Sequence, residues 1–217
     1  MKVVNISTQL TNLNHSIEGA SGNHVNLINP MPRDIELTDI SWALSRIARF
    51  NGHTMEVQPY SVASHSVWVA SYLYLVTQDP TIALHGLLHD AHEAYTGDIA
   101  QPLKSIPEVQ AAIKPIEERV QRAIYIALDM PSLTPEIAAW VSQADEQALA
   151  YEAQQLMYSS GEGWSLPTLR PEALKVGAPE GVSPTKSYRQ FLHMYKLLNL
   201  KLIANQEEMK GKNNEQI

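Results

Sequence analysis

The segment of residues 80–94 is apolar on nearly every side of a helix, and this feature constrains the fold more than any other. Its apolar residues recur around the whole helical turn instead of along one stripe: Ile82, Ala83, Leu84, Leu87, Leu88 and Ala91. A helix that is hydrophobic all round must be surrounded by other elements. The sequence therefore predicts an all-α fold, a helical bundle with residues 80–94 at its centre.

Other segments with apolar residues at three- and four-residue spacing predict the helices around that centre. Thr38 or Asp39 would cap the first of them, Asn51-Gly52 would stop it, and Pro115 would kink or restart a later one. No strand pattern of any length and no internal repeat is found. The predicted helices span residues 38–50, 61–77, 107–129 and 135–158, and a last one is opened by Ser183-Pro184.

The length of 217 residues suits a single domain. Residues 1–37 are rich in Asn, Gly and Pro and predict an irregular arm, whereas residues 38–205 form the predicted helical domain. Residues 159–182 hold most of the later Gly and Pro and predict a long loop before the last helix. Residues 206–217 are expected to be a polar tail that frays.

The bulk composition excludes several classes of function. A formal net charge of −7 argues against binding to nucleic-acid polymers or anionic membranes. The absence of cysteine removes disulfides, thiolate metal sites and thiol nucleophiles. Because no apolar run reaches the roughly 18 residues of a membrane span and the start does not resemble a signal peptide, we expect a cytoplasmic protein.

Polar side chains at inward positions of three predicted helices are the candidates for chemistry. His65 lies on the apolar stripe of its helix, His89 and Asp90 lie near the end of the most apolar helix, and Asp145 faces inward. A lone core histidine or aspartate is more often simply hydrogen-bonded, but four such groups in one core favour a common partner over coincidence. A divalent cation, bound at about 2.0–2.2 Å, would satisfy all of them together.

The order H…HD…D of these four residues resembles the HD-domain phosphohydrolases, an all-α family of metal-dependent enzymes, over roughly residues 38–150. The resemblance implies that all four are metal ligands. "HDAHEAYTGDIAQPLK" is similar to the HD…E…TGD…P.K segment of bacterial 5′-deoxynucleotidases, and "IARF" resembles their Arg-aromatic pair. The sequence "ALSRIARFNGHT…YSVASHS" is most similar to phage- and prophage-type HD hydrolases.

The resemblance also implies roles for residues beside the ligands. Glu93, one turn after His89 on a helix, suits a general base or water-positioning group. Asp98 would orient the nucleophile or protonate the leaving alkoxide, and the stretch from Asp98 through Ile99 to Gln101 would touch the nucleotide. Arg49 would clamp the phosphate with its planar guanidinium. Phe50 either orients the substrate or is a core aromatic.

One metal ion is expected, because the dinuclear relatives need extra histidines and only His92 lies between Asp90 and Asp145. Imidazole and carboxylate ligands are compatible with Mn, Fe, Co, Ni, Zn or Mg. The chain departs from its relatives at Ser64, where they usually carry a glutamate. Such a carboxylate would orient the second ring nitrogen of the ligand His65, so its absence leaves that ring without an evident partner.

The remaining candidates receive structural interpretations. His53 is expected to have a local structural role, although it could touch the phosphate. His85 is expected to be a satisfied core histidine and His92 to face the rim of the site. Lys104 is interpreted as a solvated surface lysine, in preference to a second residue that contacts the phosphate.

The predicted activity is hydrolysis of a nucleoside 5′-monophosphate to nucleoside and phosphate, by a homodimer if the resemblance holds for assembly. The first alternative is a dNTP triphosphohydrolase that releases triphosphate. Alarmone hydrolysis is disfavoured because Glu93 is followed by Ala94 and not by Asp, and cyclic-nucleotide hydrolysis because it generally needs the second metal. An inactive HD fold that serves as a nucleotide sensor or interaction module is the alternative outside enzymes.

Overall fold

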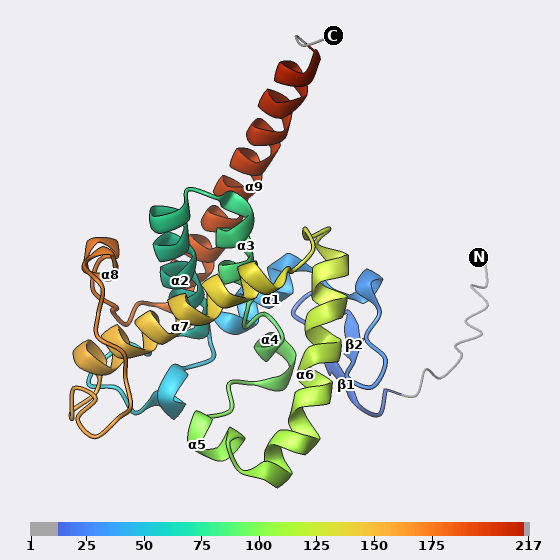
Figure 1. Ribbon diagram of the computed structural model, residues 1–217. Coiled ribbons are helices and arrows are strands. Elements are labelled where there is room, and N and C mark those ends of the chain that lie inside the picture. Colours follow the sequence, from blue (N-terminus) through green and yellow to red (C-terminus); the bar gives the residue numbers. More distant parts are fainter. Residues whose placement is uncertain (1–12, 215–217) are drawn as a thin grey trace, which may run out of the picture.

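Helix α3 (Pro80–Leu88) is the centre of the bundle in the computed structural model, which describes residues 13–214 (Figure 1). Leu84, Leu87 and Leu88 are fully buried. The helix begins with Pro80 in its first turn and with the side chain of Asp79 accepting a hydrogen bond from the Thr81 N–H at 2.7 Å. The predicted central helix is therefore confirmed.

The end of this central helix differs from the prediction, because α3 ends at Leu88 instead of continuing to residue 94. The chain turns through residues 89–92 and then forms the short helix α4 (Glu93–Thr96). This break follows the last fully buried leucine, at the point where polar side chains begin. The consecutive residues after Leu88 can therefore direct their side chains to one place.

Three long helices pack around α3, and their positions agree with the predicted segments. Helix α2 begins where Ser61 Oγ accepts a hydrogen bond from the Ser64 N–H at 3.2 Å, and α7 begins where Thr134 Oγ1 accepts one from the Ile137 N–H at 3.2 Å. Both caps satisfy a backbone donor of the first turn. The three helices are α2 (Val62–Thr77), α7 (Pro135–Leu156) and α9 (Pro184–Asn214).

The segment predicted as a helix over residues 38–50 is divided into two elements. Helix α1 (Leu37–Leu44) ends early, and the 3-10 turn η2 (Arg49–Gly52) follows. The predicted cap is wrong, because Asp39 lies inside α1 and accepts hydrogen bonds from Ser21 N (2.9 Å) and Ser21 Oγ (2.7 Å). A long-range partner has replaced the local one.

Two further helices lie between residues 97 and 134. Helix α5 (Gln101–Lys104) precedes α6 (Pro107–Ala127), which agrees with the segment predicted over residues 107–129 and contains Pro115. The predicted loop 159–182 holds one further short helix, α8 (Pro171–Val176). The indole N–H of Trp68 donates to the Gly177 carbonyl at 2.9 Å and attaches this loop to α2.

The predicted irregular arm contains a small antiparallel hairpin of β1 (Ser16–Glu18) and β2 (His24–Asn26), in which Ile17 pairs with Val25. Strands of three residues are too short for an alternating pattern to be recognised in the sequence. The 3-10 turn η1 (Pro32–Asp34) follows. Residues 1–12 of the arm lie outside the described residues.

Helix α9 packs Phe191 and Leu198 into the core, and its C-terminal part projects from the rest of the molecule (Figure 1). The segment from residue 206, expected to be a fraying polar tail, continues the helix as far as Asn214, and Gln, Glu, Met and Lys are good helix formers. Among the described residues, no helix is both long and apolar enough to cross a membrane. The all-α fold class is confirmed apart from the small hairpin.

Candidate metal centre

Three side chains from three different helical segments meet at one point. His65 Nε2 lies 3.1 Å from Asp145 Oδ1 and 3.3 Å from His89 Nε2, and His89 Nε2 lies 3.8 Å from Asp145 Oδ1. His65 is on α2, His89 directly follows α3, and Asp145 is on α7. Ligand atoms this close together can share a single metal ion.

The fourth predicted ligand, Asp90, lies beside these three. Its Oδ2 is 3.1 Å from His89 Nε2 and 3.6 Å from His65 Nε2. The position follows from the end of α3, because the turn after Leu88 directs the adjacent residues His89 and Asp90 to the same side. The structure therefore brings together all four residues that the sequence singled out.

The second nitrogen of each imidazole ring has its own partner. His89 Nδ1 donates to the Gly86 carbonyl at 2.8 Å, and His65 Nδ1 donates to Glu152 Oε1 at 2.6 Å. Because both acceptors need the proton on Nδ1, each Nε2 is left to face the shared point. Two imidazole nitrogens and two carboxylates form a donor set that fits a divalent transition metal or Mg²⁺.

Glu152 is a site residue that the sequence interpretation missed. Its carboxylate is fully buried on α7, and Oε2 accepts a hydrogen bond from Arg49 Nε at 3.0 Å. Glu152 follows Asp145 by two helical turns, so both lie on one face of α7. A glutamate at that spacing from an inward aspartate is the signal that could have identified it.

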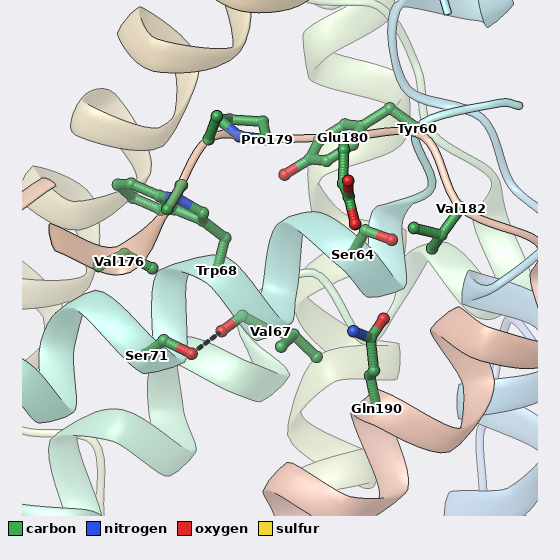
Figure 2. A pocket seen from close by; sticks show the side chains of 12 residues that line it. Tyr60, Ser64, Val67, Trp68, Ser71, Val176, Pro179, Glu180, Val182 and Gln190 are labelled. Carbon is green, nitrogen blue, oxygen red and sulfur yellow. Dashed lines mark hydrogen bonds between the residues drawn. The ribbon is translucent and has the colours of Figure 1, made fainter. Parts of the chain in front are cut away.

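The side chain of Ser64 has partners other than the neighbouring ligand candidate His65. Its hydroxyl lies 3.1 Å from Ser61 Oγ and 3.2 Å from Ser187 Oγ, and it lines a cavity of about 160 Å³ together with Tyr60 (Figure 2). The carboxylate expected to be missing next to His65 is supplied by Glu152 from α7. The doubt raised by the departure at Ser64 is thereby removed.

Arg49 points from η2 toward the same centre. A guanidinium nitrogen, Nη1, is 3.8 Å from Asp90 Oδ2, and the group lies 5.5 Å from the centre of the Phe50 ring. Burial acts to lower the pKa of Arg49, but the carboxylates of Glu152, Asp145 and Asp90 outweigh it and raise the pKa. Arg49 therefore stays charged in its half-buried position.

The ligand candidates perturb one another strongly. Burial and Arg49 act to lower the pKa of His65, but Glu152 and Asp145 outweigh them and raise it. Burial also opposes the charge on His89, yet Asp90 and Asp145 raise its pKa well above the ordinary range. These imidazoles hold protons in the absence of a metal, so a cation that binds there must displace them.

Glu93 and Asp98 lie close to this centre, although Glu93 begins the separate helix α4 and does not continue the helix of His89. Burial, followed by the charges of Asp90 and Asp98, raises the pKa of Glu93 to about 10. Glu93 Oε2 is buried and has no hydrogen-bond partner in the described part of the chain. Burial also raises the pKa of Asp98, with Arg49 opposing and Asp90 adding to the effect.

The residues proposed to contact the nucleotide differ in their surroundings. Phe50 is half-buried with φ of 55°, and its ring centre lies 6.2 Å from that of Trp164, an exposed aromatic on the loop after α7 that the sequence interpretation missed. Ile99 is half-buried, and Gln101 is exposed at the start of α5. Phe50 is thus not a fully buried core residue.

A cavity of about 310 Å³ adjoins the metal centre and is lined by His89, His92 and Lys104. His92 Nδ1 lies 3.2 Å from Gln121 Oε1, and its place in this wall agrees with the predicted position at the rim. The interpretation of Lys104 as a solvated surface lysine is wrong, because its ammonium pairs with Glu117 at 2.9 Å and it is only partly exposed. A partner on α6, distant in sequence, holds it in the wall.

His85 and His53 lie away from the shared point. His85 is fully buried with its ring edge against Tyr125, as expected, but neither ring nitrogen has a well-formed hydrogen bond to any described residue. Burial lowers the pKa of His85, and an interaction with the backbone at Pro131 opposes this shift, so a satisfied His85 stays a prediction. His53 is exposed, and its backbone N–H donates to the Phe50 carbonyl at 2.9 Å, which agrees with a local structural role.

Comparison with known proteins points to one family. The family model of the YfbR-like 5′-deoxynucleotidases matches residues 40–158, which include all four ligand candidates and Glu152. An uncharacterized protein of Rhodobacter capsulatus is 33% identical over 141 residues, covering 63% of this chain and 70% of its own. The uncharacterized protein YfdR of Escherichia coli is 36% identical over 149 residues, covering 68% of this chain and 76% of its own.

Proposed function

From the premise that the chain belongs to the YfbR-like 5′-deoxynucleotidase family, we propose that it hydrolyses nucleoside 5′-monophosphates to nucleoside and phosphate. The family indicates a metal-dependent nucleotide phosphohydrolase, and the monophosphate substrate is the finer part of the proposal. The observation that supports it most strongly is the meeting of His65, His89, Asp90 and Asp145 at one point.

These four residues would hold a single divalent cation. When bound there, it would lower the pKa of a coordinated water and neutralise charge on the phosphate. The fit is supported by the two Nε2 atoms, which face each other at 3.3 Å while both Nδ1 atoms donate elsewhere. Among the residues that the structure describes, one cluster of side chains that could share an ion is found, made of His65, His89 and Asp145, and Asp90 lies beside it.

The neighbouring side chains would bind the phosphate and move protons. Arg49 offers the terminal nitrogens of its guanidinium to phosphate oxygens. Glu93 Oε2, which has no hydrogen-bond partner among the described residues, would hold the attacking water and accept its proton in its ionised form. A cation held beside Asp90 would favour that ionised form over the protonated one. Asp98 would protonate the leaving 5′-oxygen.

The charge pairs around the centre favour a monophosphate over a triphosphate. Arg49 is paired with Glu152, and in the adjoining cavity Lys104 pairs with Glu117 at 2.9 Å and Lys114 with Glu118 at 3.9 Å. A triphosphate carries several negative charges that need cationic partners, but Lys104 and Lys114 already pair with carboxylates, whereas Arg49 uses only Nε for Glu152 and keeps its terminal nitrogens for phosphate. The single phosphate group of a monophosphate needs only the metal and Arg49.

A nucleotide panel tests this proposal. The purified protein is assayed with nucleoside 5′-monophosphates and triphosphates in the presence of Mn²⁺, Co²⁺, Zn²⁺ or Mg²⁺, and the released phosphate and triphosphate are measured separately. We expect inorganic phosphate from the monophosphates, and none from Asp145→Asn. Release of triphosphate would establish the alternative activity, and a protein that neither binds a cation nor releases phosphate would be an inactive nucleotide-binding fold.

A homodimer in the cytoplasm also belongs to this proposal, on family grounds alone. Light scattering on the eluting protein measures the mass of the assembly, and a single 24.2 kDa species would contradict the dimer. The result does not affect the assignment of the metal centre, because all of its candidate ligands come from one chain.

A further inference from the structure

The buried carboxylate of Glu152 joins a metal-ligand candidate to the arginine beside it. Oε1 accepts the Nδ1 proton of His65 at 2.6 Å, and Oε2 accepts the Nε proton of Arg49 at 3.0 Å. We propose that Glu152 is a positioning residue that holds His65 and Arg49 in one arrangement and thereby couples metal binding to phosphate binding. This inference rests on the proposed function.

The His65 side of this contact sets the direction of the ring. With Nδ1 donating to Glu152, Nε2 is turned toward Asp145 and His89. A carboxylate acceptor behind an imidazole ligand also makes the ring a stronger donor to a metal, and the loss of such a partner typically weakens metal binding about 10–100-fold. Glu152 meets both requirements from a position that is fully buried.

The contact between Glu152 and Arg49 determines which N–H groups of the guanidinium remain for a substrate. Because Nε is used by Glu152, the terminal nitrogens point toward Asp90, where Nη1 lies 3.8 Å from Oδ2. The backbone N–H of Arg49 donates to the Tyr60 carbonyl at 2.9 Å, so the main chain is held next to the start of α2 as well. The guanidinium is therefore oriented before any phosphate arrives, which lowers the ordering cost of binding.

The backbone of α7 makes the two subsites interdependent. The same helix carries Asp145 at the metal centre and Glu152 two turns later. Both oxygens of Glu152 are occupied, so a displacement of Arg49 or of His65 leaves part of a buried carboxylate unpaired. A cation that orders His65 and Asp145 should therefore favour the Arg49 arrangement that binds phosphate, and phosphate should in turn favour cation binding.

The test measures binding of Mn²⁺ and of inorganic phosphate by calorimetry, with the full chain, in wild type and in Glu152→Gln. Glutamine keeps the shape and one acceptor oxygen but loses the charge and one of the two hydrogen bonds. We expect Mn²⁺ affinity to fall about 10–100-fold, and phosphate affinity at saturating Mn²⁺ to fall as well. The matched control is Glu146→Gln, an exposed position next to Asp145 on the same helix, which should change neither affinity.

Arg49→Lys separates the two effects. It leaves the contact between Glu152 and His65 in place but weakens the contact of Glu152 with residue 49, so phosphate affinity should fall strongly and Mn²⁺ affinity should fall less than in Glu152→Gln. If Glu152→Gln does not fold, Glu152→Asp keeps the charge but is too short to reach both partners, and it should lower at least one of the two affinities.

Two outcomes would overturn the inference, and they are distinguishable. Wild-type affinity of Glu152→Gln for both Mn²⁺ and phosphate would reduce Glu152 to a stability residue and leave the proposed function untouched. A wild-type protein that binds none of Mn²⁺, Co²⁺, Zn²⁺ and Mg²⁺ would remove the proposed function and the positioning role together.

Discussion

His65 Nε2 and Asp145 Oδ1 lie 3.1 Å apart although they belong to different helices, α2 and α7. This distance depends on how α7 packs across α2, since each residue alone would be an ordinary polar group on an inward face. Asp145 is also the more accessible of the two, with 45% of its side chain exposed, whereas His65 is fully buried. The centre is thus held by the core on one side and open to a substrate on the other.

Asp145→Asn should abolish metal binding while the fold is kept. The amide removes the negative charge from the centre, and we expect a loss of Mn²⁺ affinity of at least about 100-fold, more than is typical for a residue behind a ligand. Metal content after dialysis and circular dichroism measure the two effects. Glu146→Gln is the control, and an Asp145→Asn protein that retains a full equivalent of metal would remove Asp145 from the ligand set.

Glu93→Gln should stop turnover without releasing the metal. The residue is placed to move a proton, so we expect kcat to fall about 10²–10⁴-fold, with Mn²⁺ affinity within a few-fold of wild type. Steady-state phosphate release and calorimetry provide the two values. Near-normal kcat would contradict the role assigned to Glu93 and leave Asp98 as the remaining carboxyl for proton transfer.

In the metal-free protein, Glu93→Gln should be more stable than the wild type, and the difference in free energy of unfolding should grow as pH rises. The folded state holds a proton on Glu93 up to a pKa of about 10, whereas the unfolded chain releases it above the ordinary value of 4.5. Between these values this group lowers the stability of the wild type as pH increases, by at most about 1.4 kcal/mol per pH unit, and glutamine removes that dependence.

Urea unfolding of both metal-free proteins at about pH 6 and about pH 8 measures this difference. We expect the advantage of Glu93→Gln to be larger at the higher pH, because more of the unfolded wild-type chain is then stabilised by ionisation. Equal pH dependence of the two proteins would mean that Glu93 is ionised in the folded state and that its carboxylate finds a partner.

Metal affinity should decrease as pH falls, and the decrease should begin above the ordinary imidazole pKa of 6.5. The pKa values of His65 and His89 are raised, so both rings are protonated at higher pH than free imidazole, and a cation must displace those protons. Calorimetric titration with Mn²⁺ in buffers of different ionisation enthalpy counts the released protons. Binding without proton release across neutral pH would contradict the shared use of Nε2 by proton and metal.

Local patterns predicted most helices because helix formation and burial both follow the periodicity of apolar residues. The predicted centre at α3 and the start of α9 at Pro184 agree with the structure for this reason. The errors occur where a distant partner replaced a local one. Asp39 accepts a hydrogen bond from Ser21 instead of capping α1. Helix α3 ends at Leu88, where polar side chains begin to point toward the shared point.

The all-α class, the segments that form the core and the four candidate ligands His65, His89, Asp90 and Asp145 could be predicted from the sequence alone. Spacing and polarity are properties of one segment, and they are sufficient for those conclusions. The short distances between these side chains, and the hydrogen bond between Glu152 and His65, could not be predicted in this way. Such distances depend on how helices cross, and the crossing depends on the packing of many side chains across the whole domain.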